Sequence, residues 1–189
     1  TSLAKEGILV RTVLLPGCGT KPADMMAATS EDWQLVVQEQ ADLLAKEVNA
    51  MWLGGYSTGG NLVLDYAQKH PDKTKGLVLF SPAVEVRPPF AWLAPAASHV
   101  KDWLVTPESR PNGGQNPFQY FVVPMKGFAA FYHTMTRADD VLSAFEKTPW
   151  QGSSIVMMAA HDGLVETEDL LPRFDKAFSN PQTRLVWYG

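Results

Sequence analysis

The pattern of apolar and polar positions along the chain predicts strands that alternate with amphipathic helices. Residues 29–32 (Thr-Ser-Glu-Asp) supply an N-cap and first-turn acids for a helix that runs to about Val48. Such alternation predicts an α/β fold with a mostly parallel sheet flanked by helices. Apolar runs of strand length occupy residues 8–15, 50–53, 76–80, 154–160 and 183–188. Apolar residues recur at helical spacing over residues 30–48, 61–70 and 167–178. Residues 2–6 are predicted to be the end of a further helix, which Gly7 closes.

Residues 83–151 interrupt this alternation, because they are rich in proline and aromatic residues. A segment of this length between two strands is usually functional, so we interpret it as a cap of short helices over the strand ends. The alternative is a second layer of ordinary core. The predicted organisation is therefore a first part of the core at 1–82, a cap or lid at 83–151 before the penultimate strand, and a second part of the core at 152–189.

Composition and charge exclude several classes of partner. The 189 residues, of which 46% are hydrophobic, suffice for one domain with a sizeable core. A net charge of −4 without a basic cluster argues against nucleic acid or an anionic membrane surface as a partner. A single cysteine excludes an internal disulfide framework and favours a reducing, cytoplasmic compartment. No apolar run reaches the length of a membrane span, and no signal peptide is visible at the start.

A Gly-x-Ser-x-Gly motif stands between the predicted strand at 50–53 and the helix that follows it. Strand, tight turn and helix form the context that lifts a serine hydroxyl above the carboxyl end of a strand. Gly55 and Gly59 lack a Cβ atom and would let the strand and the helix approach closely. We predict Ser57 as a nucleophile and the N–H of Thr58 as an oxyanion donor. An ordinary glycine–serine turn is the alternative.

Three segments resemble the α/β-hydrolase superfamily, specifically its capped esterase and monoacylglycerol-lipase-like branch. The first and most specific is the elbow around Ser57. The second runs from residues 7–10 to residues 16–19 and is similar to the family's Gly-Tyr-x-Val … Gly-His-Gly strand and loop, with Cys18 where histidine is usual. The third, residues 161–165, is similar to the acid turn after the penultimate strand. Together the three segments span nearly the whole chain.

The resemblance implies a triad in which a serine attacks, a histidine takes its proton and an acid orients the histidine. Ser57 would be the nucleophile and Asp162 the acid, with Glu166 and Glu168 as lesser candidates. On the residues alone, a single aspartate in a turn such as Asp162 is more often a turn former or a helix cap than a catalytic acid.

Two parts of the family's site are missing from the sequence. The family's order puts the oxyanion loop before residue 1 and the catalytic histidine shortly after Gly189. The strand before that loop should lie between those at 8–15 and 50–53, so its absence would leave unpaired backbone groups. We therefore expect this chain to be a core piece of a longer protein, truncated at both ends. Alternatively, residues 13–17 are themselves the oxyanion strand and loop, with Pro16 replacing the histidine.

No histidine in the sequence fits the catalytic base. His70 ends the elbow helix far from the serine, where it would interact with the helix dipole. His99 and His133 lie in the predicted cap, and His161 adjoins Asp162, although adjacent residues seldom face one another. We interpret Cys18 as a small residue in a tight loop. The histidines and Cys18 lack ligand spacing, so neither a metal nor a cofactor is expected.

The aromatic and proline content of the predicted cap suggests an apolar substrate pocket. We therefore predict a serine hydrolase that cleaves carboxylic esters with a hydrophobic acyl group through an acyl-enzyme. One alternative is a non-catalytic hydrolase-fold protein that binds a ligand. Another is a hydrolase of the same fold that acts on thioester or carbon–carbon bonds, because a fold specifies only the general class. The sequence carries no signal for the oligomeric state.

Overall fold

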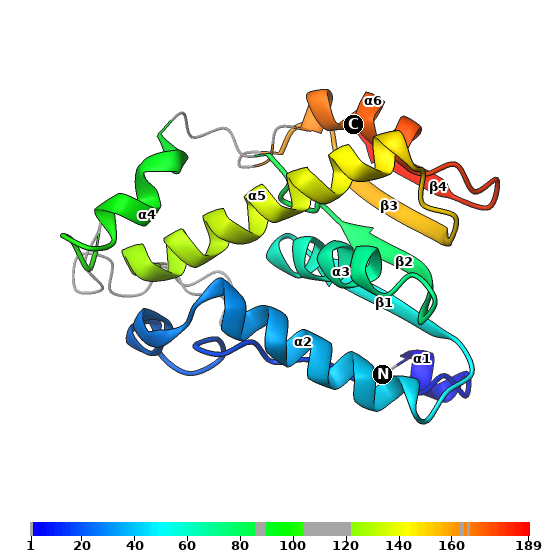
Figure 1. The fold of residues 1–189 in the computed structure, drawn as a ribbon, viewed down its shortest axis with the longest axis horizontal. Helices are drawn as coiled ribbons and strands as arrows, with labels where there is room; N and C mark the ends of the chain where they lie inside the picture. The colour runs from blue at the N-terminus through cyan, green and yellow to red at the C-terminus, as the bar shows by residue number, and fades with distance from the viewer. Residues whose placement is uncertain (1, 86–89, 104–121, 163–164, 166) are drawn as a thin grey trace.

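Four parallel strands form one sheet in the order β1-β2-β3-β4 (Figure 1). The computed structural model describes residues 2–85, 90–103, 122–162, 165 and 167–189. Its elements are α1 (Ser2–Lys5), η1 (Pro22–Ala27), α2 (Ser30–Ala45), β1 (Met51–Tyr56), α3 (Thr58–Lys69), β2 (Thr74–Phe80), η2 (Ala91–Leu93), α4 (Ala94–Ala97), α5 (Met125–Lys147), β3 (Ser153–Ala159), α6 (Thr167–Ala177) and β4 (Arg184–Tyr188).

The register of the sheet brings all four carboxyl ends to one edge. Tyr56 of β1 pairs with Phe80 of β2, which pairs with Met157 of β3. Ala159 of β3 pairs in turn with Tyr188 of β4. The prediction of a parallel α/β sheet is therefore confirmed. Loops that follow these strands meet at the same edge, which is the usual place for a site in such folds.

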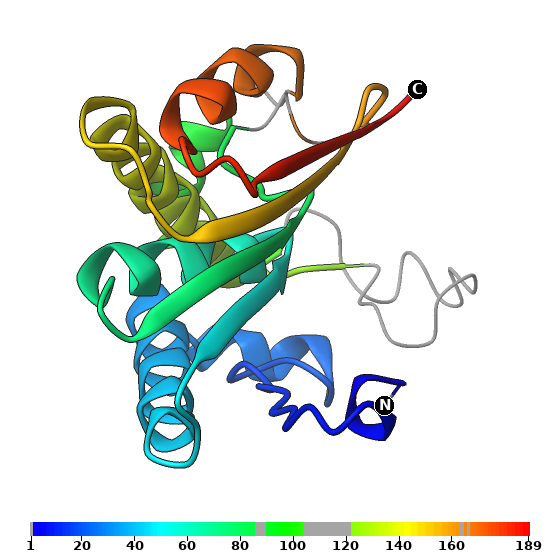
Figure 2. The same ribbon diagram turned by 90° about the vertical axis from the view of Figure 1, so that its right-hand side faces the viewer.

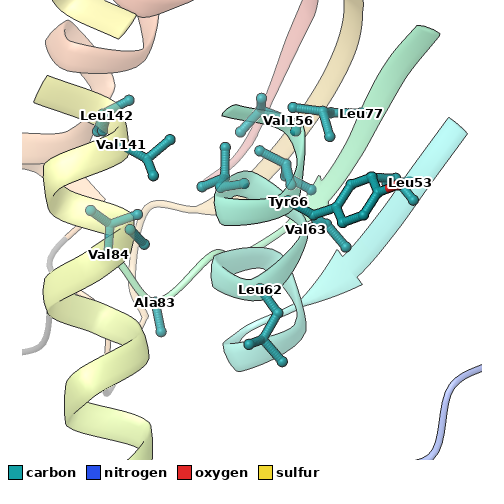
Figure 3. Packing of buried hydrophobic residues seen from close by; sticks show 14 of the residues in the cluster. Leu53, Leu62, Val63, Tyr66, Leu77, Ala83, Val84, Val141, Leu142 and Val156 are labelled. Atoms are coloured by element: carbon teal, nitrogen blue, oxygen red, sulfur yellow. The ribbon is translucent and has the colours of Figure 1, made fainter. Parts of the chain in front are cut away.

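Helices α2, α3, α5 and α6 lie on one face of this sheet (Figure 2). Strand residues alternate between the two faces, and those that point toward the helices are buried. In Figure 3, side chains from the strands pack against α3. Val141 and Leu142 of α5 lie on the other side of that helix. The labelled residues include Leu53, Leu77 and Val156 from the strands, Leu62, Val63 and Tyr66 from α3, and Val141 and Leu142 from α5.

The predicted strand at residues 8–15 is wrong. The structure assigns no strand there, and Ile8, Leu9 and Leu14 are at least half exposed. Apolar, β-branched composition favours a strand, but its N–H and C=O groups also need a neighbouring strand to pair with. The segment pairs with none of the described strands. It is attached instead to the turn that follows α2, since Arg11 Nη2 lies 2.7 Å from Glu47 Oε1.

The predicted strands and helices outside residues 8–15 and 83–151 are confirmed with small shifts at their ends. Helix α2 begins with a reciprocal capping box, in which Thr29 Oγ1 accepts from the Asp32 N–H and the Asp32 carboxylate accepts from the Thr29 N–H. It ends at Ala45 rather than near Val48. Strand β1 runs on to Tyr56, and α3 begins at once after the serine.

Helix α5, which lies within the predicted cap segment, packs along α3 and α6. Its residues Val141, Leu142 and Phe145 are buried in the main core. From α6, the guanidinium of Arg173 donates to Asp139 at 2.6 Å and to Glu146 at 3.0 Å. Much of the proline- and aromatic-rich segment, 86–89 and 104–121, lies outside the described residues, so the division at 83–151 stays a prediction. No helix in the described part of the chain is long and apolar enough to cross a membrane.

Candidate active site

Ser57 occupies a sharp kink between β1 and α3. Its backbone has φ 52° and ψ −117°, in a region that residues other than glycine seldom adopt. The Ser57 N–H still extends the ladder by donating to the Phe80 carbonyl at 2.9 Å. Although Ser57 is the N-cap residue of α3, its side chain makes no capping hydrogen bond. The half-buried Ser57 side chain therefore lies at the carboxyl end of β1, and its hydroxyl does not cap the helix.

The glycines of the motif do not contribute equally to the close approach of β1 and α3. A Cβ atom on Gly55 would fall on the backbone of Gly59 and on the Gly60 nitrogen. A Cβ atom on Gly59 would meet nothing within 4 Å, so its predicted packing role is wrong. Gly60 has the second tight contact, since its Cβ would lie 3.0 Å from the Cβ of Pro82. The crossing point between strand and helix therefore involves Gly55 and Gly60.

The first turn of α3 also places backbone donors beside the serine. Thr58 is the first residue of this 12-residue helix, so its N–H is one of those without an intrahelical acceptor. The side chain of Asn61, which is 1% exposed, fixes the same turn by donating from Nδ2 to the Ala83 carbonyl at 2.9 Å. This bond joins the helix to the segment that leaves β2.

Asp162 lies in the turn that follows β3, at the same edge of the sheet. Its Oδ1 accepts from the Val165 N–H at 2.9 Å, a contact that a turn-forming aspartate also makes. The turn is attached on both sides through Ala160. The Ala160 N–H donates to the Tyr188 carbonyl at 2.7 Å, and its carbonyl accepts from the buried Thr167 hydroxyl at 3.3 Å.

Only β2 separates the strand of Ser57 from the strand that leads to Asp162. Two spacings between neighbouring strands amount to about 10 Å. The structure thus brings the predicted nucleophile and acid to one edge of the sheet, on either side of the end of β2. Glu168 is exposed on α6, and Glu166 lies outside the described residues.

The four histidines lie elsewhere or on the surface. His70 follows the C-terminus of α3, which puts it about 18 Å from the elbow at 1.5 Å per residue. Its ring packs against Tyr66 with centroids 4.4 Å apart. His99, His133 and His161 are exposed. Groups of three or more potential metal ligands are absent from the described part of the chain.

Cys18 is half-buried in the loop between residues 15 and 20, and burial raises the pKa of its thiol. A raised pKa lowers the thiolate fraction at any given pH, so Cys18 is expected to react slowly with iodoacetamide at mildly alkaline pH. Mass spectrometry over a time course of alkylation measures the rate for the native protein and for the urea-unfolded protein, and the native rate should be the lower one. Alkylation of the native protein as fast as that of the unfolded chain would contradict it.

A shallow hollow of about 520 Å³ lies at the carboxyl edge of the sheet. It opens beside the elbow, on the sheet face that the helices leave uncovered, and most of its surface is apolar. Its lining residues are Tyr56, Phe80, Ser81, Met157, Met158, Ala159 and Tyr188. Ser81 and Asn61 were missed by sequence reasoning. A buried asparagine and a serine before a proline give no signal of a site until the backbone is known.

Comparison with known proteins gives consistent results. The profile of the family described as serine aminopeptidase, S33, matches residues 1–188. A thermostable monoacylglycerol lipase of Bacillus sp. (strain H-257) is 36% identical over 83 residues, which are 44% of this chain and 33% of that protein. The match thus spans about a third of the length of this relative.

Solved structures agree with this result at the level of the fold. A structure described for the metagenome-derived lipolytic enzymes LipS and LipT aligns with a TM-score of 0.78 at 19% identity, covering 99% of this chain and 74% of that one. The monoacylglycerol lipase of Paleococcus ferrophilus aligns with a TM-score of 0.62 at 18% identity, covering 85% of this chain and 65% of that one.

Proposed function

The chain belongs to the serine aminopeptidase, S33, family of the α/β-hydrolase superfamily, and from this premise we propose that it cleaves carboxylic esters with a hydrophobic acyl group. The observation that carries the proposal is the kink at Ser57, where φ is positive and the side chain makes no capping bond. A strained serine at a strand–helix junction is the arrangement that presents the nucleophile in α/β-hydrolases.

The proposed reaction has two halves. Ser57 Oγ attacks the ester carbonyl carbon while a histidine takes the hydroxyl proton, and the resulting oxyanion accepts a hydrogen bond from the Thr58 N–H. The intermediate expels the alcohol, which takes the proton from the histidine, and leaves an acyl-enzyme. Water then attacks the acyl-enzyme by the same route and releases the acid and free Ser57. Asp162 orients the histidine, which we place after β4, in keeping with the family's order.

Two observations favour esters over peptides as substrates, although the family's description names an aminopeptidase. The relative with the 83-residue match is a monoacylglycerol lipase, and the two aligned structures are of lipolytic enzymes. An apolar side chain is also exposed at the site. Tyr56, the last residue of β1, is 72% exposed and lines the hollow beside the elbow. Apolar surface of this kind suits an acyl chain.

A series of p-nitrophenyl esters from acetate to dodecanoate, together with amino-acid p-nitroanilides, tests the proposal when assayed with the full-length wild-type protein. We expect kcat/KM to rise along the ester series by up to about fourfold per buried CH₂, since each contributes roughly 0.8 kcal/mol. The anilides should react far more slowly. Rapid anilide cleavage without ester cleavage would instead indicate an aminopeptidase. Binding of esters without turnover would support a non-catalytic ligand-binding protein.

A further inference from the structure

Ser81, at the end of the next strand, shares the positive φ of Ser57. In the described part of the chain, these two serines are the residues other than glycine that have positive φ, at 39° for Ser81. Ser57 follows the last residue of β1 and Ser81 follows the last residue of β2. The two serines thus follow the last registered pair of the β1–β2 ladder, Tyr56 and Phe80, where neighbouring strands lie about 5 Å apart.

The surroundings of Ser81 hold it in this conformation. Its N–H donates to the Met157 carbonyl at 2.8 Å. The next residue, Pro82, packs on Gly60, and the Ala83 carbonyl accepts from buried Asn61. Glycine would adopt the same φ without strain, so a serine here keeps a hydroxyl at the expense of stability. Strain of this kind, imposed from three sides, is typical of functional positions.

Ser81 lies between the two groups that the proposed reaction must connect. Its strand separates β1, which ends at Ser57, from β3, which leads to Asp162. Any base that bridges the nucleophile and the acid has to sit over the end of β2. Ser81 is half-buried there and lines the hollow at this edge.

We propose that Ser81 is a positioning residue whose hydroxyl donates a hydrogen bond to the Asp162 carboxylate in the working site. This inference rests on the proposed function. A carboxylate has lone pairs for several donors, so this bond can coexist with the one from the Val165 N–H. Held from two directions, the carboxylate keeps a fixed orientation toward the base, and through it toward Ser57.

Two variants of Ser81 separate the hydroxyl from the backbone strain. Ser81→Ala removes the hydroxyl and keeps the strain, whereas Ser81→Gly removes both. We expect kcat for a p-nitrophenyl ester to fall by about 10- to 100-fold in both variants, as for a misplaced catalytic group. KM should stay within about twofold, because substrate binding is untouched. Ser153→Ala, at the opposite edge of the sheet, is the matched control and should keep wild-type kcat.

The same experiment includes the outcomes that would overturn the inference. A wild-type kcat in Ser81→Gly would show that the hydroxyl has no role in the reaction and that the positive φ serves only the turn. A loss of kcat accompanied by an equal rise in KM, or by a fall in Tm beyond about 5 °C in Ser81→Gly, would also assign Ser81 a structural role. Fluorophosphonate labelling of the wild type separates this failure from that of the proposed function. A labelled, ester-cleaving wild type with unaffected Ser81 variants rejects only the inference, whereas an unlabelled and inactive wild type rejects both.

Discussion

Ser57→Ala is expected to lower kcat for ester hydrolysis by about 10⁴-fold or more, because removing the nucleophile of a triad leaves only the rate enhancement from binding and oxyanion donors. The folded structure should be unaffected. The Ser57 hydroxyl makes no capping bond in α3, so its loss leaves no helix donor without its partner. Initial rates on the best p-nitrophenyl ester, measured beside the Tm of each variant, check both parts.

Ser179→Ala is the matched control for this prediction. Ser179 is exposed and accepts a hydrogen bond from Gln151 at 3.1 Å, away from the carboxyl edge. It should keep wild-type kcat and Tm. Retention of more than about a tenth of the wild-type rate by Ser57→Ala would be incompatible with a serine nucleophile at this position.

Gly55→Ala is expected to destabilise the fold by about 3 kcal/mol, at the upper end of the range for overpacked sites. The new Cβ would fall on the backbone of Gly59 and Gly60, which no side-chain rotation can relieve. Strand β1 and helix α3 would have to move apart, and the buried face of α3 would lose contact with the sheet. Urea or thermal unfolding measures the effect, and a lowering of Tm by roughly 6–12 °C is expected.

Gly59→Ala makes the same chemical change at the other end of the motif. Its Cβ would meet open space in the first turn of a helix, where alanine is favoured over glycine. Its Tm should equal or exceed that of the wild type. If both variants unfolded at the same temperature, the close approach at Gly55 would not be a determinant of stability.

Local patterns in the sequence predicted most of the elements, because their signals lie within a few residues of one another. The capping box of Thr29 and Asp32 marks the start of α2, and the spacing of Leu62, Val63 and Tyr66 marks the buried face of α3. The parallel sheet followed from apolar runs that alternate with such helices.

Features that depend on distant partners were not predictable in this way. Residues 8–15 have the composition of a strand, yet pairing is decided by which strands are adjacent in space. The unequal roles of Gly55, Gly59 and Gly60 depend on where α3 crosses β1. The positive φ of Ser81 arises from packing of the residues after β2 on α3, which the dipeptide Ser-Pro does not reveal.

The site was predictable only in part for the same reason. The motif around Ser57 specifies its own kink, because glycines and the following helix are close in sequence. Asp162 needed the resemblance to a family, since an aspartate in a turn is common. Its turn is held by hydrogen bonds of Ala160 to Tyr188 in the last strand and to Thr167 in α6, and both partners are distant from Ser57 in the sequence.

The most direct test of the account is where a fluorophosphonate probe attaches to the full-length wild-type protein. Labelled protein is digested and its peptides are mapped by mass spectrometry, with Ser57→Ala treated in parallel. The account predicts one adduct, on Ser57, and none in the variant. The absence of an adduct, or an adduct on another serine such as Ser81, would contradict the assignment of Ser57 as the nucleophile.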